Sequence, residues 1–156
     1  MARQVLFQDR LVNKSIIMVI STIVLVGTVA LILAINYLNI PTMFYPFLSL
    51  SLVVPLVLLA LLYRIDIVAD DHNITITLGV GLIKSIIPYT AIVSQSIKNT
   101  TIEPQSTGLK KQENNILYSM TNVDKATTFS TKSNNHYTIA TNKAEELTAI
   151  LKRMVE

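Results

Sequence analysis

The feature that most constrains this chain is an uncharged stretch from residue 15 to residue 63, which contains no Asp, Glu, Lys, Arg or His. A bilayer core about 30 Å thick is crossed by roughly 20 apolar residues in a helix. The stretch is therefore too long for one crossing and has a suitable length for two. We expect membrane helices over residues 15–38 and 44–63, which together form a transmembrane hairpin over residues 15–63.

The segment between the two expected helices has the composition of a turn. It contains Asn39 and Pro41, and a proline disfavours helical backbone at the residue before it. Pro46 suits the first turn of the second helix, whereas Pro55 is expected to kink that helix. A cleaved signal peptide would have a shorter apolar core and a small-residue cleavage motif, so we expect the hairpin to be retained.

Aromatic side chains stand at the ends of both expected helices, where the membrane–water interface favours them. We expect four membrane-interface anchors, which are Tyr37, Phe44, Tyr45 and Tyr63.

Basic residues flank the hairpin on the side of the chain termini. Arg3, Arg10 and Lys14 precede it and Arg64 follows it, whereas the connecting turn carries no charge. By the positive-inside rule, we expect a multi-pass protein of the cell membrane with both termini in the cytoplasm. Residues 1–14 then form a cytoplasmic N-terminal segment.

Residues 64–156 have the composition of one small soluble domain, and their hydrophobic pattern changes to a period of two. A β-hairpin is expected from the alternation in 65–69 and 74–78 around a polar turn at 70–73. The remaining expected elements are strands over 91–98 and 100–103, a polar loop over 105–115, strands over 116–120, 126–131 and 136–140, and a C-terminal helix. Asn142 is the expected N-cap of this helix, with Glu145 as its partner. Its apolar stripe comprises Leu147, Ile150, Leu151 and Met154.

Seven short strands followed by one amphipathic helix is the element order of the pleckstrin-homology (PH) superfold. The Gly-Val-Gly-Leu-Ile run with Ile87-Pro88-Tyr89, and the closing residues 137–142 before Glu145-Glu146-Leu147, resemble bacterial and archaeal PH-like domains that follow two membrane helices. The resemblance implies a membrane α-helical hairpin plus an α+β domain. That domain would be a seven-stranded antiparallel, partly open barrel capped by the C-terminal helix.

No motif for catalysis or cofactor binding occurs in the sequence. Cysteine is absent, which excludes disulfides and thiolate chemistry. The adjacent residues Asp70, Asp71 and His72 suit a turn better than a metal site, which needs three or four convergent ligands. We therefore expect no catalytic residue, no metal, no cofactor and no enzyme activity. The basic residues are scattered, so we expect no nucleic-acid partner.

These features together predict a non-enzymatic, membrane-anchored interaction module, an accessory or scaffolding subunit of a membrane protein complex. Its expected partners are membrane lipids and either another integral membrane protein or further copies of this chain. The alternative is a domain that senses anionic lipids. Arg64, Lys110 and Lys111 are its candidate headgroup contacts, although lipid recognition usually needs four or more clustered basic residues.

Overall fold

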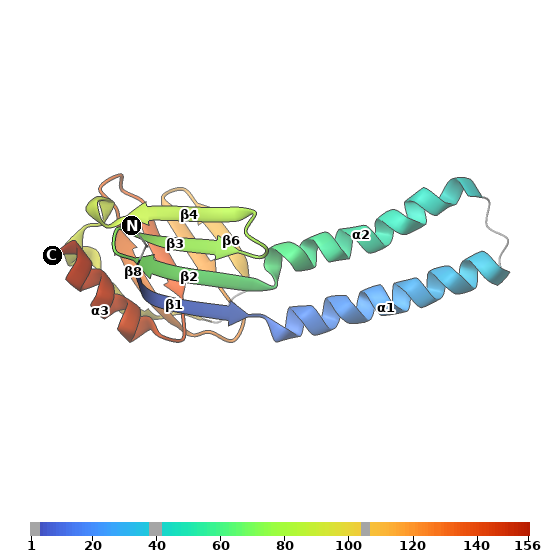
Figure 1. Cartoon of the computed structure of the whole chain (residues 1–156), viewed down its shortest axis with the longest axis horizontal. Coiled ribbons are helices and arrows are strands. Elements are labelled where there is room, and N and C mark those ends of the chain that lie inside the picture. The colour runs from blue at the N-terminus through green and yellow to red at the C-terminus, as the bar shows by residue number, and fades with distance from the viewer. Residues whose placement is uncertain (1–3, 38–41, 104–106) are drawn as a thin grey trace.

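The computed structural model describes residues 4–37, 42–103 and 107–156 and consists of a β-domain from which a pair of helices projects (Figure 1). The helices are α1 (Lys14–Tyr37) and α2 (Tyr45–Leu62), and a short 3-10 turn, η1 (Thr42–Phe44), precedes α2. Both helices are long and apolar enough to cross a membrane, judged by length and composition. The expected turn at Pro41, the last residue of the expected first helix and Pro104 lie outside the described residues.

The two helices lie side by side and pack through small and apolar residues. A Cβ atom on Gly27 of α1 would lie 2.9 Å from Cδ2 of Leu52, so the glycine permits a close approach of α2. The hydroxyls of Thr22 and Thr28 donate to the carbonyls of Met18 and Val24 in α1 itself. Because these hydrogen bonds satisfy the two hydroxyls within α1, neither hydroxyl is needed to bind α2, and apolar side chains make the contact between the helices.

The segment in front of α1 is a strand of the β-domain, which the sequence pattern did not indicate. Strand β1 (Val5–Val12) pairs antiparallel with β2 (Arg64–Asp70), with Leu11 opposite Ile65. The helix pair is thus inserted between two neighbouring strands of one sheet. The inward-facing positions of β1 include the buried Asp9, whose charge interrupts the apolar alternation that would have marked a strand.

Two sheets make up the β-domain. The first is an antiparallel meander in the order β1-β2-β3-β4, completed by β3 (Asn73–Leu78) and β4 (Ile83–Pro88). The second has the order β5-β8-β9-β7-β6. Its strands are β5 (Lys98–Thr101), β6 (Gly108–Gln112), β7 (Asn115–Ser119), β8 (Lys125–Ser130) and β9 (His136–Ala140).

The sheet arrangement differs from the expected seven-stranded antiparallel barrel. The described residues contain nine strands in two sheets, and β7 runs parallel to β9. The β-rich domain with a C-terminal helix is as predicted, but its strand count and pairing are not. Pairing between strands is a long-range property that short, degenerate patterns do not determine.

Two local predictions were wrong in the middle of the domain, and a third strand was predicted with shifted bounds. No strand spans 91–98: the unpredicted β4 ends at Pro88, and two 3-10 turns follow it, η2 (Tyr89–Ala91) and η3 (Ser94–Ser96). The strand expected over 100–103 is β5, which begins earlier, and the expected loop over 105–115 contains β6. Strand β4 leaves Ile83 and Ile86 exposed, so it lacks the strict alternation of a half-buried strand.

The core lies between the sheets and beneath helix α3 (Ala144–Val155), which contributes the fully buried Leu147 and Leu151. The prediction of Asn142 as N-cap was wrong, because Lys143 holds that position and makes no side-chain capping bond. The hydroxyl of Thr141 accepts the backbone N–H of Lys143 at 3.1 Å instead.

The turn at residues 70–73 confirms the polar hairpin turn expected there. Oδ1 of Asp70 accepts the backbone N–H groups of His72 and Asn73, both at 2.8 Å. The hydroxyl of the buried Tyr89 donates to the carbonyl of Asp70 at 2.8 Å. Burial, assisted by the negative charges of Asp70 and Asp71, raises the pKa of Tyr89 from 10.0 to about 12.

We predict that the contribution of Tyr89 to stability is lost in alkaline solution. An unfolded tyrosine releases its proton near pH 10 and the folded Tyr89 near pH 12, so the contribution is complete below pH 10 and disappears as the pH rises to about 12. At neutral pH, Tyr89→Phe should lower the free energy of unfolding by about 1 kcal/mol through the lost hydrogen bond.

The measurement is chemical unfolding of the parent protein and of Tyr89→Phe in mild detergent from pH 7 to pH 12. The difference between the parent and Tyr89→Phe should shrink above pH 10. Tyr37→Phe, at an exposed site, is the control and should not change the profile. A difference that stays constant through pH 12 would contradict the prediction.

Candidate functional site

Several polar contacts that link separate parts of the chain lie at the junction between the helix pair and the first sheet. Strand β1 leads into α1, and α2 leads into β2, so both helices leave the domain from adjacent strands. The backbone N–H of Asn13 donates to the carbonyl of Tyr63 at 2.8 Å. This bond continues the β1–β2 ladder up to the point where the helices begin.

Asn13 caps α1 and ties it to the second sheet. Its Oδ1 accepts the backbone N–H of Ile16 at 2.9 Å, as an N-cap does, and its amide donates to the hydroxyl of Thr107. The same hydroxyl accepts the backbone N–H of Thr121 at 3.1 Å. The start of α1 is therefore fixed to segments before β6 and after β7. Asn13 is itself buried, so these bonds satisfy polar groups that water does not reach.

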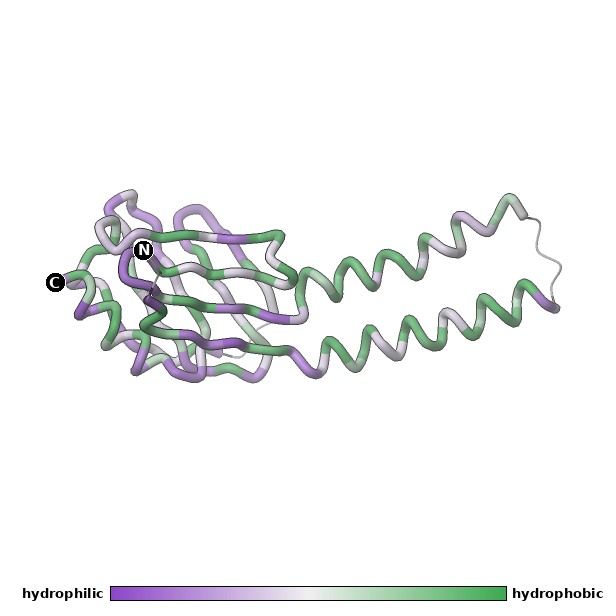
Figure 2. The backbone as a smooth tube through the Cα atoms, viewed as in Figure 1, coloured by the Kyte–Doolittle hydropathy of each residue, from purple (hydrophilic) through white to green (hydrophobic). Residues whose placement is uncertain are grey.

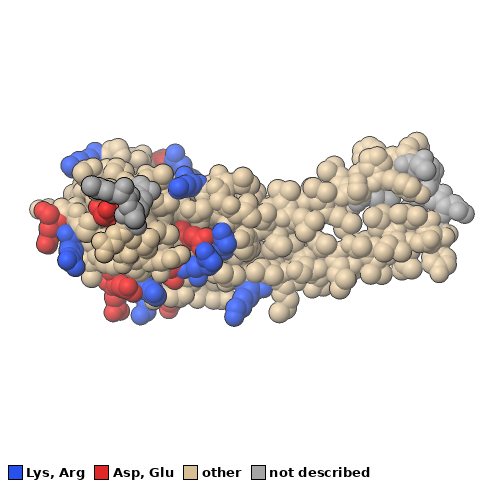
Figure 3. Space-filling view, in the orientation of Figure 1, with Lys and Arg blue, Asp and Glu red and all other residues tan. Residues whose placement is uncertain are grey.

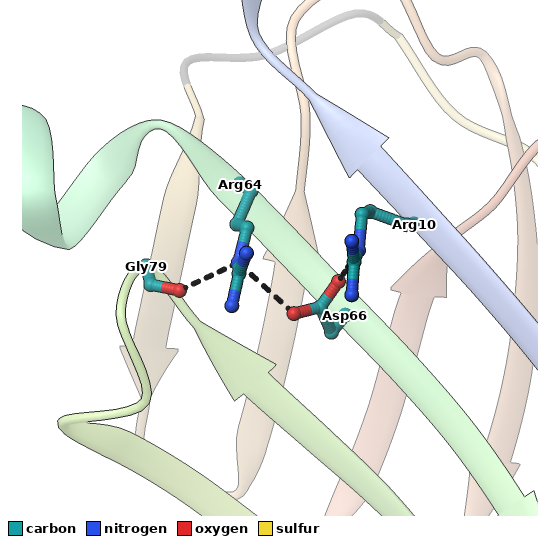
Figure 4. Close-up of polar contacts among 4 residues, drawn as sticks. All are labelled: Arg10, Arg64, Asp66 and Gly79. Carbon is teal, nitrogen blue, oxygen red and sulfur yellow. Dashed lines mark hydrogen bonds and ion pairs between the residues drawn. The ribbon is translucent and has the colours of Figure 1, made fainter.

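Asp66 lies between two arginines on the outer face of the first sheet (Figure 4). Its Oδ1 accepts a hydrogen bond from Nε of Arg10 at 2.7 Å, and its Oδ2 lies 3.0 Å from Nε of Arg64. Nε of Arg64 also lies 2.9 Å from the carbonyl oxygen of Gly79, to which it donates. This cluster connects β1, β2 and the loop after β3.

The loop between β3 and β4, residues 79–82, closes the C-terminal end of α2. Its Val80 N–H donates to the carbonyl of Ala60 at 2.9 Å, and the Gly79 N–H donates to the carbonyl of Arg64 at 2.8 Å. The first bond satisfies a carbonyl that the end of α2 would otherwise leave open, and the second extends the β2–β3 ladder. Gly79 has φ +59°, and a Cβ there would lie 2.0 Å from the carbonyl oxygen of Ala60. Only glycine fits this position.

The four expected interface anchors lie at the two ends of the helix pair. Tyr37, Phe44 and Tyr45 are exposed at the end far from the domain. Tyr63 lies at the near end, where the guanidinium carbon of Arg64 is 5.2 Å from its ring centroid. This is a cation–π distance, so the aromatic ring also helps to position Arg64.

The three candidate headgroup contacts come from two different sheets. Lys110 and Lys111 are exposed on β6, an edge strand of the second sheet, and Arg64 lies on the first sheet. The Nε of Arg64 is directed to Asp66 and Gly79. Sequence reasoning did not identify the contacts of Arg10, Asn13 and Asp66 at this junction, because their partners are distant in the chain and no local pattern connects them.

Within the described ranges, no group of three or more His, Asp or Glu residues is placed to hold a metal ion. A hollow of about 240 Å³ lies beside the end of β1, and its lining includes Arg10, Lys14 and Asn142. Comparison of the chain with protein-family models, with curated proteins and with solved structures finds no match.

We predict that Gly79→Ala destabilises the chain more than Gly81→Ala. Both glycines have positive φ, so either alanine should cost about 1–3 kcal/mol in backbone strain. Only the alanine at 79 collides with the backbone of α2, because the nearest atom at 81 is the Thr77 methyl at 3.9 Å. Thermal unfolding in mild detergent should give a lower midpoint for Gly79→Ala. Equal midpoints would show that the loop at Gly79 is not in close contact with the backbone of α2.

We predict unequal couplings of Asp66 to its two arginines. The side chain of Arg10 is 55% exposed, whereas that of Arg64 is 27% exposed and that of Asp66 is 13% exposed. Solvent screening should limit the Arg10–Asp66 coupling to about 0–1 kcal/mol. The Arg64–Asp66 coupling should be larger. Two double-mutant cycles with Arg10→Gln, Arg64→Gln and Asp66→Asn measure both values by chemical unfolding. A larger coupling for Arg10 would contradict this assignment.

Proposed function

We propose that α1 and α2 cross a lipid bilayer and anchor the β-domain at its surface. The two helices run in opposite directions and are hydrophobic along their length (Figures 1 and 2). Figure 3 shows charged side chains on the domain and at the base of the helices, and none farther out. Helical rise gives lengths of about 36 Å for α1 and about 27 Å for α2, and helices of roughly 17–25 residues can cross a bilayer core.

The best-supported function of the anchored domain is that of a non-enzymatic interaction module. The observation that carries this proposal is the insertion of the helix pair between β1 and β2, with hydrogen bonds across the junction. Because the domain is tied to both helices, its position relative to the membrane is fixed. A fixed position suits a subunit that presents a binding surface to neighbouring proteins in the same membrane.

We further propose that the domain is a variant of the PH-like fold. A four-stranded meander, a second sheet and a C-terminal helix packed on the core support this assignment. The parallel β7–β9 pair and the helices inserted after β1 are departures from the arrangement that the resemblance implies.

The proposed partner is another integral membrane protein or a second copy of this chain. In α1 no described side chain is buried, so both helices retain apolar surface after pairing with each other. An apolar crevice of about 330 Å³ between them is lined in part by Ile20, Thr28 and Leu56. Association of helices in lipid depends on packing into surfaces of this kind. By the positive-inside rule, the domain and both termini lie in the cytoplasm.

The test is crosslinking of the full chain in its native membrane, followed by affinity purification in mild detergent. We expect a protein partner or a crosslinked second copy to be recovered. The double variant Lys110→Gln/Lys111→Gln tests the alternative function, in which the domain binds anionic lipid through these two lysines. Recovery that survives these substitutions supports protein recruitment. A lone monomer, with or without the substitutions, would refute the proposal.

Lipid dependence should be measured on the full chain in nanodiscs with and without anionic lipid. A fragment that begins at residue 64 would lack β1 and with it the buried Phe7 and Leu11. Without β1, the edge of β2 would be unpaired and the core incomplete. Lipid binding by such a fragment would therefore not represent the folded domain.

A further inference from the structure

We propose that an apolar tip, formed by Val80 and Leu82 of the β3–β4 loop and by Ile83 at the start of β4, enters the interfacial layer of the same bilayer that α1 and α2 cross. The domain would then contact lipid at a site outside its helices. This inference rests on the proposed membrane anchoring and adds to it a lipid-contact site within the β-domain.

The hydrogen bonds of the loop place its tip at the level of the last turn of α2. The N–H of Val80 donates to the carbonyl of Ala60 at 2.9 Å. Ala60 precedes Arg64 by four residues, which corresponds to about 6 Å along a helix axis. If the last turn of α2 lies in the membrane interface, the backbone of Val80 lies at the same depth.

The side chains of the tip have the chemistry of a lipid contact. Leu82 is 72% exposed and Val80 is 56% exposed, although both are apolar, and Ile83 is exposed beside them. Residues 79–83 carry no charge. A group of exposed apolar side chains on a small domain marks an interaction surface, and this group adjoins the apolar surface of α2. This continuity identifies lipid as the occupant.

The charges around the tip also suit a membrane surface. Lys84 follows the tip directly, and Arg64 binds the loop carbonyl of Gly79. The acidic Asp66 is paired with both Arg10 and Arg64, so its charge is compensated near the headgroups. Basic residues at this position attract anionic lipids.

The loop is held in place before it meets lipid. Gly79 has a left-handed backbone that closes the loop against α2, and its carbonyl and N–H are both bonded. A loop that is already ordered loses little conformational entropy on insertion.

Tryptophan fluorescence tests the inference directly, because the chain contains no tryptophan. Leu82→Trp places a single probe on the tip. Val26→Trp in α1 is the control for the anchor. Val93→Trp is the control for the aqueous part of the domain, because Val93 is exposed and follows the end of β4 remote from the loop. Each full chain is placed in nanodiscs with or without lipids brominated near the top of the acyl chains. Thermal midpoints confirm that each variant retains the fold.

We expect the emission of Leu82→Trp to shift to shorter wavelength relative to Val93→Trp and to be quenched by the brominated lipid. Val93→Trp should show neither effect, and Val26→Trp should show a blue-shifted emission. A probe at 82 that behaves like the probe at 93, while the probe at 26 reports lipid, would overturn this inference alone. A probe at 26 that reports water would overturn the anchoring and this inference together.

Discussion

The pairing of β1 with β2 is the interaction on which the rest of the structure depends. It joins two segments that are separated in sequence by the whole helix pair, and it places the start of α1 beside the end of α2. Because neighbouring strands in a sheet lie only about 5 Å apart, the two helices leave the domain already close to packing distance. The sheet therefore aligns the helices. The packing of the helices against each other in turn keeps the two ends of the long insertion between β1 and β2 close together.

The junction extends this coupling to the remainder of the domain. Asn13 connects the start of α1 to Thr107, and the β3–β4 loop closes the end of α2 through Val80. Asp66 joins β1 to β2 through Arg10 and Arg64. These contacts come from both sheets, so a displacement of the helices would disturb each of them. A domain held in this way has a defined orientation relative to α1 and α2, which is the physical basis of the proposed role as a positioned interaction module.

The elements that sequence reasoning predicted well are those whose signal is local. The apolar helices follow from a long uncharged run, and the hairpin around Asp70 and the amphipathic stripe of α3 follow from short periodic patterns. The elements that it missed depend on distant partners. Strand β1 contains the buried Asp9, whose Oδ2 accepts a hydrogen bond from the hydroxyl of Thr141 at 2.5 Å. A charged residue at an inward-facing position breaks the apolar alternation of the strand. The strand is therefore not recognised from its own residues, because the hydrogen-bond partner of the charge lies far along the chain. The candidate site was missed for the same reason, because Asp66 and Arg10 are 56 residues apart.

The sequence by itself determined that this chain carries two apolar helices beside a β-rich domain that ends in a helix. Uncharged length and hydrophobic period are properties of consecutive residues, so no structure is needed to recognise them. Only the tertiary structure decided that the helices are inserted within a sheet, that the strands form two sheets with one parallel pair, and that Gly79 and Val80 close α2. These features are choices of partner between segments far apart in the chain, and they are settled by burial and by hydrogen bonds that form only when the whole domain has folded.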